Sequence, residues 1–335
     1  MKAKSGSRFI KENRTRLETV IPLKTPFLLF VDPSSACNFR CGFCPCGNAH
    51  KSLWTDQKNT SVMSYELFRK IIDDISYFPE KIKTLRLYKE GEPLLNKRLP
   101  DMIRYAKRSN SVGSIDFTTN GVLLTKDLGL ALVDSGLDRI NISIEALDSD
   151  GYLKISGVKI DYDAFYENLS YFYKHKENCY VFMKISDAAV NTEKEKERFF
   201  QMYGDICDEI SVEHITPVWP EFDLDKDYTP KTNSIYNDVT IKECDVCPYI
   251  FYSICVNSDG SVSACLMDWN HKQIVGNIAE QSLKDIWNSD AMKALRYKHL
   301  KCGRSKIDVC NKCGQMEYGA LDNIDDYREE LLKKI

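Results

Sequence analysis

Short apolar runs alternate with amphipathic stretches between about residue 25 and residue 213. The runs are often β-branched, as strands buried in a parallel sheet tend to be. They predict six strands, over residues 27–32, 82–88, 114–119, 139–144, 180–186 and 209–213. Apolar residues at helical spacing predict helices between them, over residues 64–78, 99–107, 125–136, 162–175 and 192–204. This alternation predicts an α/β fold with a parallel sheet. Because six units are too few for an eight-fold barrel, we expect a partial (β/α)6 TIM-like barrel.

The pattern changes after about residue 235. Residues 251–269 predict a β-hairpin with Asp259 and Gly260 at its turn. Residues 282–300 predict one helix, and a Cys-x-x-Cys knuckle follows at 310–313. We therefore expect an N-terminal extension, a partial barrel, a small cysteine-rich hairpin and helix domain, and a C-terminal helix. Their expected bounds are residues 1–24, 25–235, 236–318 and 319–335.

Composition narrows the class of protein. Apolar residues make up 43% of the chain and charged residues 28%, as in an ordinary globular protein. A net charge of −3 gives no sign of a nucleic-acid tail or a polybasic membrane anchor. The longest apolar run near the N-terminus, residues 27–31, is too short to cross a bilayer, and no secretory pattern precedes it. We expect a cytoplasmic protein.

Cysteine usage adds chemistry to this picture. The chain holds 13 cysteines, of which four lie between residues 37 and 46 and seven between 244 and 313. In an intracellular chain of this length, thiols at such close spacing indicate metal binding more than a disulfide framework. The spacing Cys-x3-Cys-x2-Cys puts Cys37, Cys41 and Cys44 in one loop. A structural zinc site takes four protein ligands, whereas a [4Fe–4S] cluster held by three cysteines leaves one iron open. Cys46 is either a fourth ligand of a structural site or, as we favour, a nearby thiol.

The segment "CNFRCGFC" resembles the signature of radical S-adenosylmethionine (SAM) enzymes, with Phe43 at its aromatic position. The resemblance implies a [4Fe–4S] cluster whose open iron binds SAM. It also implies reductive cleavage of SAM to a 5′-deoxyadenosyl radical that abstracts hydrogen from the substrate. The segment "KEGEPLLN" resembles the family's Gly-Gly-Glu-Pro motif, which contacts the methionine amino group. Gly91, Glu92 and Pro93 carry that match, while Glu90 replaces the first glycine.

Polar residues at three strand ends extend the resemblance. Thr119 and Asn120 end the third strand and are expected to contact the cofactor. Ser143 on the fourth strand resembles the ribose-contacting serine, and Lys184 on the fifth is expected to pair with the cofactor carboxylate. Each also has a structural explanation: a turn, a buried hydroxyl, or a lysine that reaches solvent.

The C-terminal third resembles the family's auxiliary-cluster extension, called SPASM or, when reduced, twitch. Cys247, Gly260 and Cys265 fit its opening, with twelve residues before the glycine and four after it. With Cys310 and Cys313, the two cysteines would hold one auxiliary [4Fe–4S] cluster. Three cysteines remain, of which two could replace a ligand and one is expected to pack in a strand: Cys244, Cys302 and Cys255. A zinc ribbon formed by the pairs 244/247 and 310/313 stays open.

An auxiliary cluster near the substrate favours net oxidation, and the resemblance indicates dehydrogenation of a sugar- or cyclitol-like molecule. That reaction needs a base, for which Glu213, His214 and Asp268 are the candidates. A flavodoxin or ferredoxin is the expected reductant. Modification of a ribosomal peptide or protein is the alternative, although few residues precede the first strand. A non-catalytic iron–sulfur or zinc protein is the third hypothesis.

Overall fold

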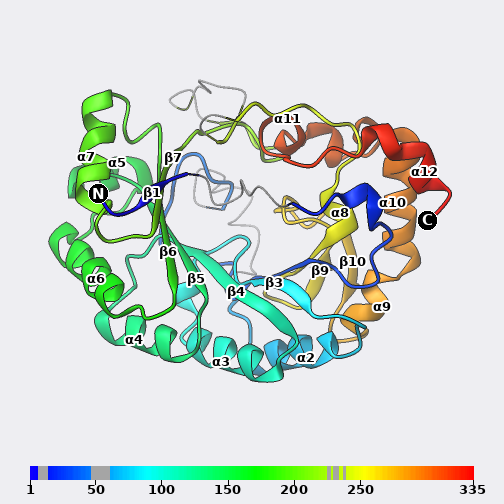
Figure 1. Ribbon diagram of the computed structural model, residues 1–335, viewed down its shortest axis with the longest axis horizontal. Helices are drawn as coiled ribbons and strands as arrows, with labels where there is room; N and C mark the ends of the chain where they lie inside the picture. Colours follow the sequence, from blue (N-terminus) through cyan, green and yellow to red (C-terminus); the bar gives the residue numbers. More distant parts are fainter. Residues whose placement is uncertain (7–13, 47–60, 225–227, 229–233, 237–238) are drawn as a thin grey trace.

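The computed structural model describes residues 1–6, 14–46, 61–224, 228, 234–236 and 239–335. Within them, ten strands form one sheet in the order β1-β7-β6-β5-β4-β3-β2-β8-β9-β10. Every pair from β1 to β8 in that order is parallel, and β8, β9 and β10 are antiparallel. The sheet curves as an open barrel with helices along its outer side (Figure 1).

All six strands expected in the barrel are present. They are β2 (Leu28–Val31), β3 (Ile82–Arg86), β4 (Val112–Thr119), β5 (Arg139–Ile144), β6 (Tyr180–Ser186) and β7 (Glu209–Glu213). The sequence did not predict β1 (Lys4–Ser5), which pairs with β7. This strand is only two residues long and polar, so it carries no apolar pattern. The N-terminal segment therefore contributes the last strand on one side of the sheet.

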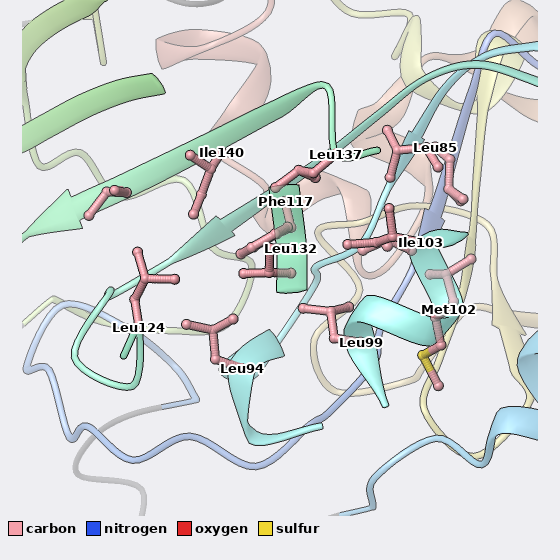
Figure 2. Close-up of a cluster of buried hydrophobic side chains, with 14 of the residues drawn as sticks. Leu85, Leu94, Leu99, Met102, Ile103, Phe117, Leu124, Leu132, Leu137 and Ile140 are labelled. Atoms are coloured by element: carbon pink, nitrogen blue, oxygen red, sulfur yellow. The ribbon is translucent and has the colours of Figure 1, made fainter. Parts of the chain in front are cut away.

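The helices of the barrel alternate with its strands as expected, except that two helices lie between β5 and β6 and the sequence predicted only the second of them. They are α2 (Tyr65–Ile75), α3 (Leu99–Ser109), α4 (Lys126–Asp134), α5 (Ser149–Ser156), α6 (Tyr162–His175) and α7 (Glu193–Tyr203). The N-caps of α2 and α4, Ser64 and Thr125, accept hydrogen bonds from backbone N–H groups of the first turn. Figure 2 shows Leu99, Met102 and Ile103 of α3 gathered with Leu85 of β3 and Phe117 of β4. This buried layer fixes the outer face of the sheet, so the opposite side chains face inward.

The predicted hairpin is part of the same sheet. Its first strand, β8 (Ser253–Val256), lies parallel to β2 along Leu28–Val31. A turn with Gly260 at φ +90° leads to β9 (Ser261–Ser263), and β10 (Ile274–Asn277) follows. Backbone hydrogen bonds therefore tie the cysteine-rich region directly to the barrel.

The prediction of a single helix over residues 282–300 is wrong, because this segment forms two helices, α9 (Leu283–Trp287) and α10 (Asp290–Cys302). Ser289 interrupts it, since its hydroxyl accepts from the N–H of Met292 and begins a new helix. The expected C-terminal helix is confined to α12 (Arg328–Leu332). Just before it, the Asp325 carboxylate accepts the N–H groups of Asp245 and Val246, a long-range contact that the sequence pattern does not reveal.

Short helices complete the structure. The α-helical turns are α8 (Tyr249–Tyr252) and α11 (Gln315–Tyr318). The 3-10 helices are η1 (Leu17–Thr19), η2 (Pro93–Leu95), η3 (Arg304–Lys306), η4 (Cys310–Lys312) and η5 (Asp325–Tyr327). In the described ranges, none of the helices combines the length and the apolar character needed to span a membrane.

Candidate functional site

A cavity of about 680 Å³ lies on the concave side of the sheet. Each strand from β2 to β7 contributes an inward side chain to it, namely Phe30, Arg86, Thr118, Ser143, Lys184 and Glu213. Phe43 and Cys44 of the first cysteine loop line the cavity, as does His214 after β7. Leu266, Met267 and Gln315, which neighbour the C-terminal cysteines in the sequence, line it as well. A single cavity therefore runs from the first cysteine loop to residues that are adjacent in the sequence to Cys265 and Cys313.

The first cysteine loop brings three thiols together. The pKa of Cys41 is raised by burial, and the thiolates of Cys44 and Cys37 lie close enough to raise it further. The loop turns at an N–H of Cys44 that donates to the carbonyl of Cys41, 3.2 Å away. None of the 13 cysteines, which all lie in the described part of the chain, forms a disulfide. A raised thiol pKa keeps the sulfur protonated until a metal displaces the proton.

Cys46 lies next to this group. A hydrogen bond with Cys44 and burial raise the pKa of Cys46, and the Glu90 and Asp32 carboxylates add to the effect. Its thiol therefore faces a second set of charged groups as well as the cysteine loop.

Gly91 and Glu92 anchor the next predicted segment against the cysteine loop. A Cβ atom at position 91 would overlap the carbonyl oxygens of Ser34 and Ala36, so only glycine fits. The N–H of Glu92 donates to the Ala36 carbonyl at 2.8 Å. Pro93 is buried and begins η2. The Gly-Glu-Pro segment therefore fixes the backbone that leads into Cys37.

Glu92 is buried and its carboxylate is fully engaged. It accepts hydrogen bonds from the Thr119 hydroxyl at 2.6 Å, the Asn120 N–H at 2.9 Å and the Leu94 N–H at 3.0 Å. Burial raises the pKa of Glu92, while these hydrogen bonds act in the opposite direction. Asn120 also donates to the Asn38 side chain in the cysteine loop, at 2.8 Å. Neither Thr119 nor Asn120 lines the cavity; the neighbouring Thr118 does.

Ser143 faces the cavity as expected, and sequence reasoning missed Glu145 beside it. The two residues are two positions apart and both line the cavity. Burial raises the pKa of Glu145 to about 7, and the Lys184 ammonium lowers it in part. The sequence did contain a signal for Glu145. Side chains two positions apart along a strand point to the same face, so Glu145 was expected to lie on the same face as Ser143.

Lys184 and Glu213 form an ion pair inside the cavity. The Lys184 ammonium lies 2.5 Å from Oε2 of Glu213, and both line the cavity wall. The two strands are in register here, with Lys184 opposite Ser211 and Ser186 opposite Glu213. The Glu213 carboxylate therefore holds the Lys184 ammonium in a position from which it can contact a ligand in the cavity.

His214 and Asp187 lie together where β7 and β6 end. Nδ1 of His214 is 3.0 Å from Oδ2 of Asp187, whose Oδ1 accepts the N–H of Ile215 at 3.2 Å. Of the two side chains, His214 lines the cavity and Asp187 does not. Sequence reasoning missed Asp187, because the pairing of two strand ends brings it next to His214.

Asp268, the third predicted base, lies outside the cavity wall. Its carboxylate accepts the N–H groups of Lys272 at 2.8 Å and Gln273 at 3.0 Å, which closes the turn before β10. Its backbone carbonyl accepts from the buried Lys89 ammonium at 2.9 Å.

Lys89 and Glu90 join the barrel to the hairpin. The Lys89 ammonium lies 2.6 Å from Oε1 of Glu90 and donates to the Asn257 side chain at 2.8 Å. Nε2 of His271 lies 2.7 Å from the same Glu90 oxygen. Glu90, the departure from the family motif, therefore binds groups from both regions. We call Lys89, Glu90, Asn257 and His271 the junction cluster.

The four predicted auxiliary ligands also come together. Burial raises the pKa of Cys247 and of Cys265. Nearby thiols of the group raise both pKa values further, those of Cys310 and Cys313 for Cys247 and those of Cys247 and Cys313 for Cys265. The Gln273 amide donates to Sγ of Cys310 at 3.2 Å, and the Met267 N–H to Sγ of Cys265 at 3.4 Å. Hydrogen bonds of this kind to thiolate sulfur tune the potential of an iron–sulfur cluster.

The remaining three cysteines differ in setting. Cys244 is buried and its thiol contacts the Met316 sulfur at 3.5 Å. Cys255 is buried within β8, as the sequence pattern indicated, and Cys302 is exposed at the end of α10. Within the described residues, no three His, Cys, Asp or Glu side chains converge on a single-ion site. Cluster binding does not require such convergence, because each cysteine ligates a different iron.

Comparison with known proteins identifies two regions of the chain. Residues 31–186 match the radical SAM superfamily, and residues 247–314 match the iron–sulfur cluster-binding domain called SPASM. These ranges contain the first and the second cysteine group.

Two curated relatives match over different lengths. The tungsten-containing aldehyde ferredoxin oxidoreductase cofactor-modifying protein of Pyrococcus furiosus is 26% identical over 308 residues, covering 80% of this chain and 83% of that protein. A probable GTP 3′,8-cyclase of Methanococcus aeolicus is 35% identical over 127 residues, covering 37% of this chain and 39% of the cyclase. The similarity to the cyclase therefore concerns less than half of either protein.

Two solved structures share the fold. Streptococcus suis SuiB, bound to S-adenosylmethionine, superposes with a TM-score of 0.63 at 16% identity, covering 90% of this chain and 73% of SuiB. BtrN, in complex with AdoMet and 2-DOIA, superposes with a TM-score of 0.54 at 22% identity, covering 86% of this chain and 92% of BtrN. The partial barrel with a cysteine-rich C-terminal region is thus an architecture found among SAM-binding proteins.

Proposed function

The chain belongs to the radical SAM superfamily, and from this premise we propose that it dehydrogenates a sugar- or cyclitol-like small molecule. It is an enzyme that uses SAM, a [4Fe–4S] cluster and auxiliary iron–sulfur chemistry. When bound, these groups supply one-electron cleavage of SAM and a 5′-deoxyadenosyl radical that abstracts a hydrogen atom. The rest of the proposal concerns what the residues of this chain contribute.

The donor chemistry of both cysteine groups fits iron–sulfur clusters. Cys37, Cys41 and Cys44 would hold the SAM-binding cluster, which leaves one iron without a protein ligand. The auxiliary cluster would be held by the second group of thiols, Cys247, Cys265, Cys310 and Cys313. Support comes from the mutual proximity of the thiols in each group and from the N–H donors to Cys265 and Cys310.

The polar lining beside the first loop suits SAM. Ser143 and Glu145 offer a hydroxyl and a carboxyl group to the cofactor's hydroxyls, and Lys184 offers an ammonium to its carboxylate. Phe43 supplies an apolar surface next to Cys44. Glu92, Thr119 and Asn120 support the cysteine loop from behind the cavity wall.

One observation carries the dehydrogenase proposal: the cavity extends from Cys44 of the first cysteine group to residues adjacent in the sequence to Cys265 and Cys313 of the second. A substrate between them could lose a hydrogen atom at one end and an electron at the other. The volume of about 680 Å³ lies in the range of small-molecule sites. BtrN binds AdoMet together with 2-DOIA, and this chain shares its fold.

Anaerobic turnover tests the proposal. The reconstituted enzyme would be incubated with SAM, dithionite and a panel of cyclitols and hexoses that includes 2-DOIA. We expect one 5′-deoxyadenosine and one ketone per turnover, and neither after Cys41→Ala. Cys179→Ala is the matched control, because Cys179 is a buried core thiol far from both groups in the sequence.

The same assay separates peptide modification from the proposed function. A product altered in a peptide, with no ketone from any member of the panel, would overturn the dehydrogenase assignment and leave the superfamily assignment intact. The structure of SuiB bound to its precursor peptide SuiA superposes on this chain with a TM-score of 0.62. Peptides therefore belong in the assay.

A further inference from the structure

We propose that Asp187 is a positioning residue that holds His214 in the tautomer whose Nε2 accepts the hydroxyl proton of the substrate. The inference rests on the proposed dehydrogenation and deepens it, because it selects one base and adds a residue that orients it.

The backbone holds both partners rigidly at the carboxyl edge of the sheet. The N–H of Asp187 donates to the Glu213 carbonyl at 2.9 Å, which continues the pairing of β6 with β7. The N–H of His214 donates to the Ile235 carbonyl at 2.9 Å. Catalytic groups of parallel α/β barrels sit at this edge.

The hydrogen-bond donors around Asp187 determine the tautomer of His214. An ionised carboxylate only accepts hydrogen bonds, and Asp187 already receives the Ile215 N–H on Oδ1. Nδ1 of His214 lies 3.0 Å from Oδ2, and because the ionised carboxylate carries no proton, the proton of this hydrogen bond belongs to Nδ1. In a neutral imidazole the other nitrogen then carries the lone pair.

Nε2 of His214 has no competing hydrogen-bond partner among the residues that the structure describes. His214 lines the cavity, and its side chain is 17% exposed. Among the residues that the structure describes, no hydrogen bond to its Nε2 is present; the one bond of the ring is that of Nδ1. The lone pair is therefore open to a ligand in the cavity.

The other two predicted bases are less suited to accept a proton. Protonation of Glu213 would break its 2.5 Å ion pair with Lys184 inside the cavity. Asp268 does not line the cavity, and its oxygens bind the N–H groups of Lys272 and Gln273.

In the proposed step, bound SAM would supply the radical that takes the hydrogen atom of the carbinol C–H bond, which breaks homolytically. The O–H bond then breaks, its proton passes to Nε2 of His214, and a C=O bond forms. The auxiliary iron–sulfur group would supply the oxidant that takes up the one electron released. The Asp187 carboxylate stays ionised throughout and stabilises the imidazolium through the hydrogen bond from Nδ1–H.

The tautomer can be read directly by nitrogen-15 NMR of the histidine-labelled holoprotein, kept oxidised and without substrate. The chain holds five histidines, and the His214 signals would be assigned by their loss in His214→Gln. We expect a protonated Nδ1 and an unprotonated Nε2. A wild-type spectrum with the proton on Nε2 would overturn the inference.

Asp187→Asn provides the sharper comparison. The Asn oxygen still accepts the Ile215 N–H, whereas its NH2 group donates to Nδ1 and moves the ring proton to Nε2. We expect a reversed tautomer, a loss of ketone formation of at least 100-fold, and substrate-independent SAM cleavage within about 2-fold of the wild type. An unchanged tautomer in Asp187→Asn contradicts the inference.

Asp205→Asn is the matched control, because Asp205 is exposed and pairs with the N-terminal amine. It should leave the His214 signals unchanged. If the expected tautomers appear but no cyclitol or hexose yields a ketone, the proposed function fails while the positioning role of Asp187 stands.

Discussion

Single residues show where backbone and burial constrain this protein most. Gly91 is required by space, because the carbonyls of Ser34 and Ala36 occupy the region where a side chain would begin. The same contact sets the approach of the cysteine loop to the Glu92 segment. A change of one methyl group here should therefore affect both stability and the cofactor site.

Gly91→Ala is expected to lower the free energy of unfolding by about 3 kcal/mol, as overpacked sites do. The shifted loop should also weaken SAM binding by at least 10-fold. Anaerobic urea unfolding and isothermal titration with SAM measure the two effects. The control is Gly6→Ala, whose Cβ would meet only the flexible end of Glu209, 3.3 Å away. Equal effects of the two substitutions would contradict the steric explanation.

His299 is a second constrained residue. Its side chain is fully buried in α10, and neither ring nitrogen has a hydrogen-bond partner among the residues described by the structure. Burial lowers its pKa from 6.5 to about 4. The folded protein therefore keeps the ring neutral at pH values where the unfolded chain takes up a proton.

Acidification should consequently destabilise the fold through His299. Between pH 7.5 and 5.5 only the unfolded state gains this proton, so the free energy of unfolding falls by about 1 kcal/mol from this residue. The fall would continue until the folded-state pKa near 4 is reached. His299→Leu removes the titrating group and should show a correspondingly smaller decrease in anaerobic urea unfolding. The same pH dependence in wild type and variant would refute the assignment.

Secondary-structure elements divide into those that the apolar pattern reveals and those that tertiary contacts create. The six barrel strands are buried and β-branched, so residues such as those of Arg139–Ile144 were predictable. In contrast, Lys4–Ser5 owes its strand to pairing with β7, and the break at Ser289 depends on a cap within an otherwise helical stretch. The junction of β8 with β2 could not be predicted, because parallel pairing across the sequence leaves no local signal.

The junction cluster links two such elements and should be costly to disrupt. In Lys89→Met, the buried carboxylate of Glu90 loses its ammonium partner, so the free energy of unfolding should fall by about 3 kcal/mol. Adding Glu90→Gln should recover more than half of this loss, since the buried charge is then removed. Anaerobic urea unfolding provides the measurement.

Lys312→Met is the control for that experiment, because Lys312 forms an exposed ion pair with Glu221. Its effect should stay below about 1 kcal/mol. If Lys89→Met is no more destabilising than Lys312→Met, the junction cluster does not hold the hairpin to the barrel.

At the scale of the whole molecule, the fold class and the two cysteine groups could be predicted from the sequence. The spacing of Cys37, Cys41 and Cys44 is specific, and strand ends indicated Ser143, Lys184 and the acid–base candidates after the sixth strand. The sequence could not show that Thr118 lines the cavity while Thr119 and Asn120 lie behind its wall. Which of these side chains faces a ligand depends on burial in the folded protein. The position of Asp187 beside His214 could not be predicted, because it depends on the register in which β6 pairs with β7.

The proposed function depends on a cluster that three cysteines of the first loop would hold with one iron available to SAM. Electron paramagnetic resonance of the dithionite-reduced, anaerobically purified protein tests it most directly. We predict a cluster signal that changes when SAM is added and that disappears in Cys37→Ala/Cys41→Ala/Cys44→Ala, while the signal of the auxiliary site persists. A spectrum that SAM leaves unchanged, from a loop in which every metal has a full set of protein ligands, would contradict the account.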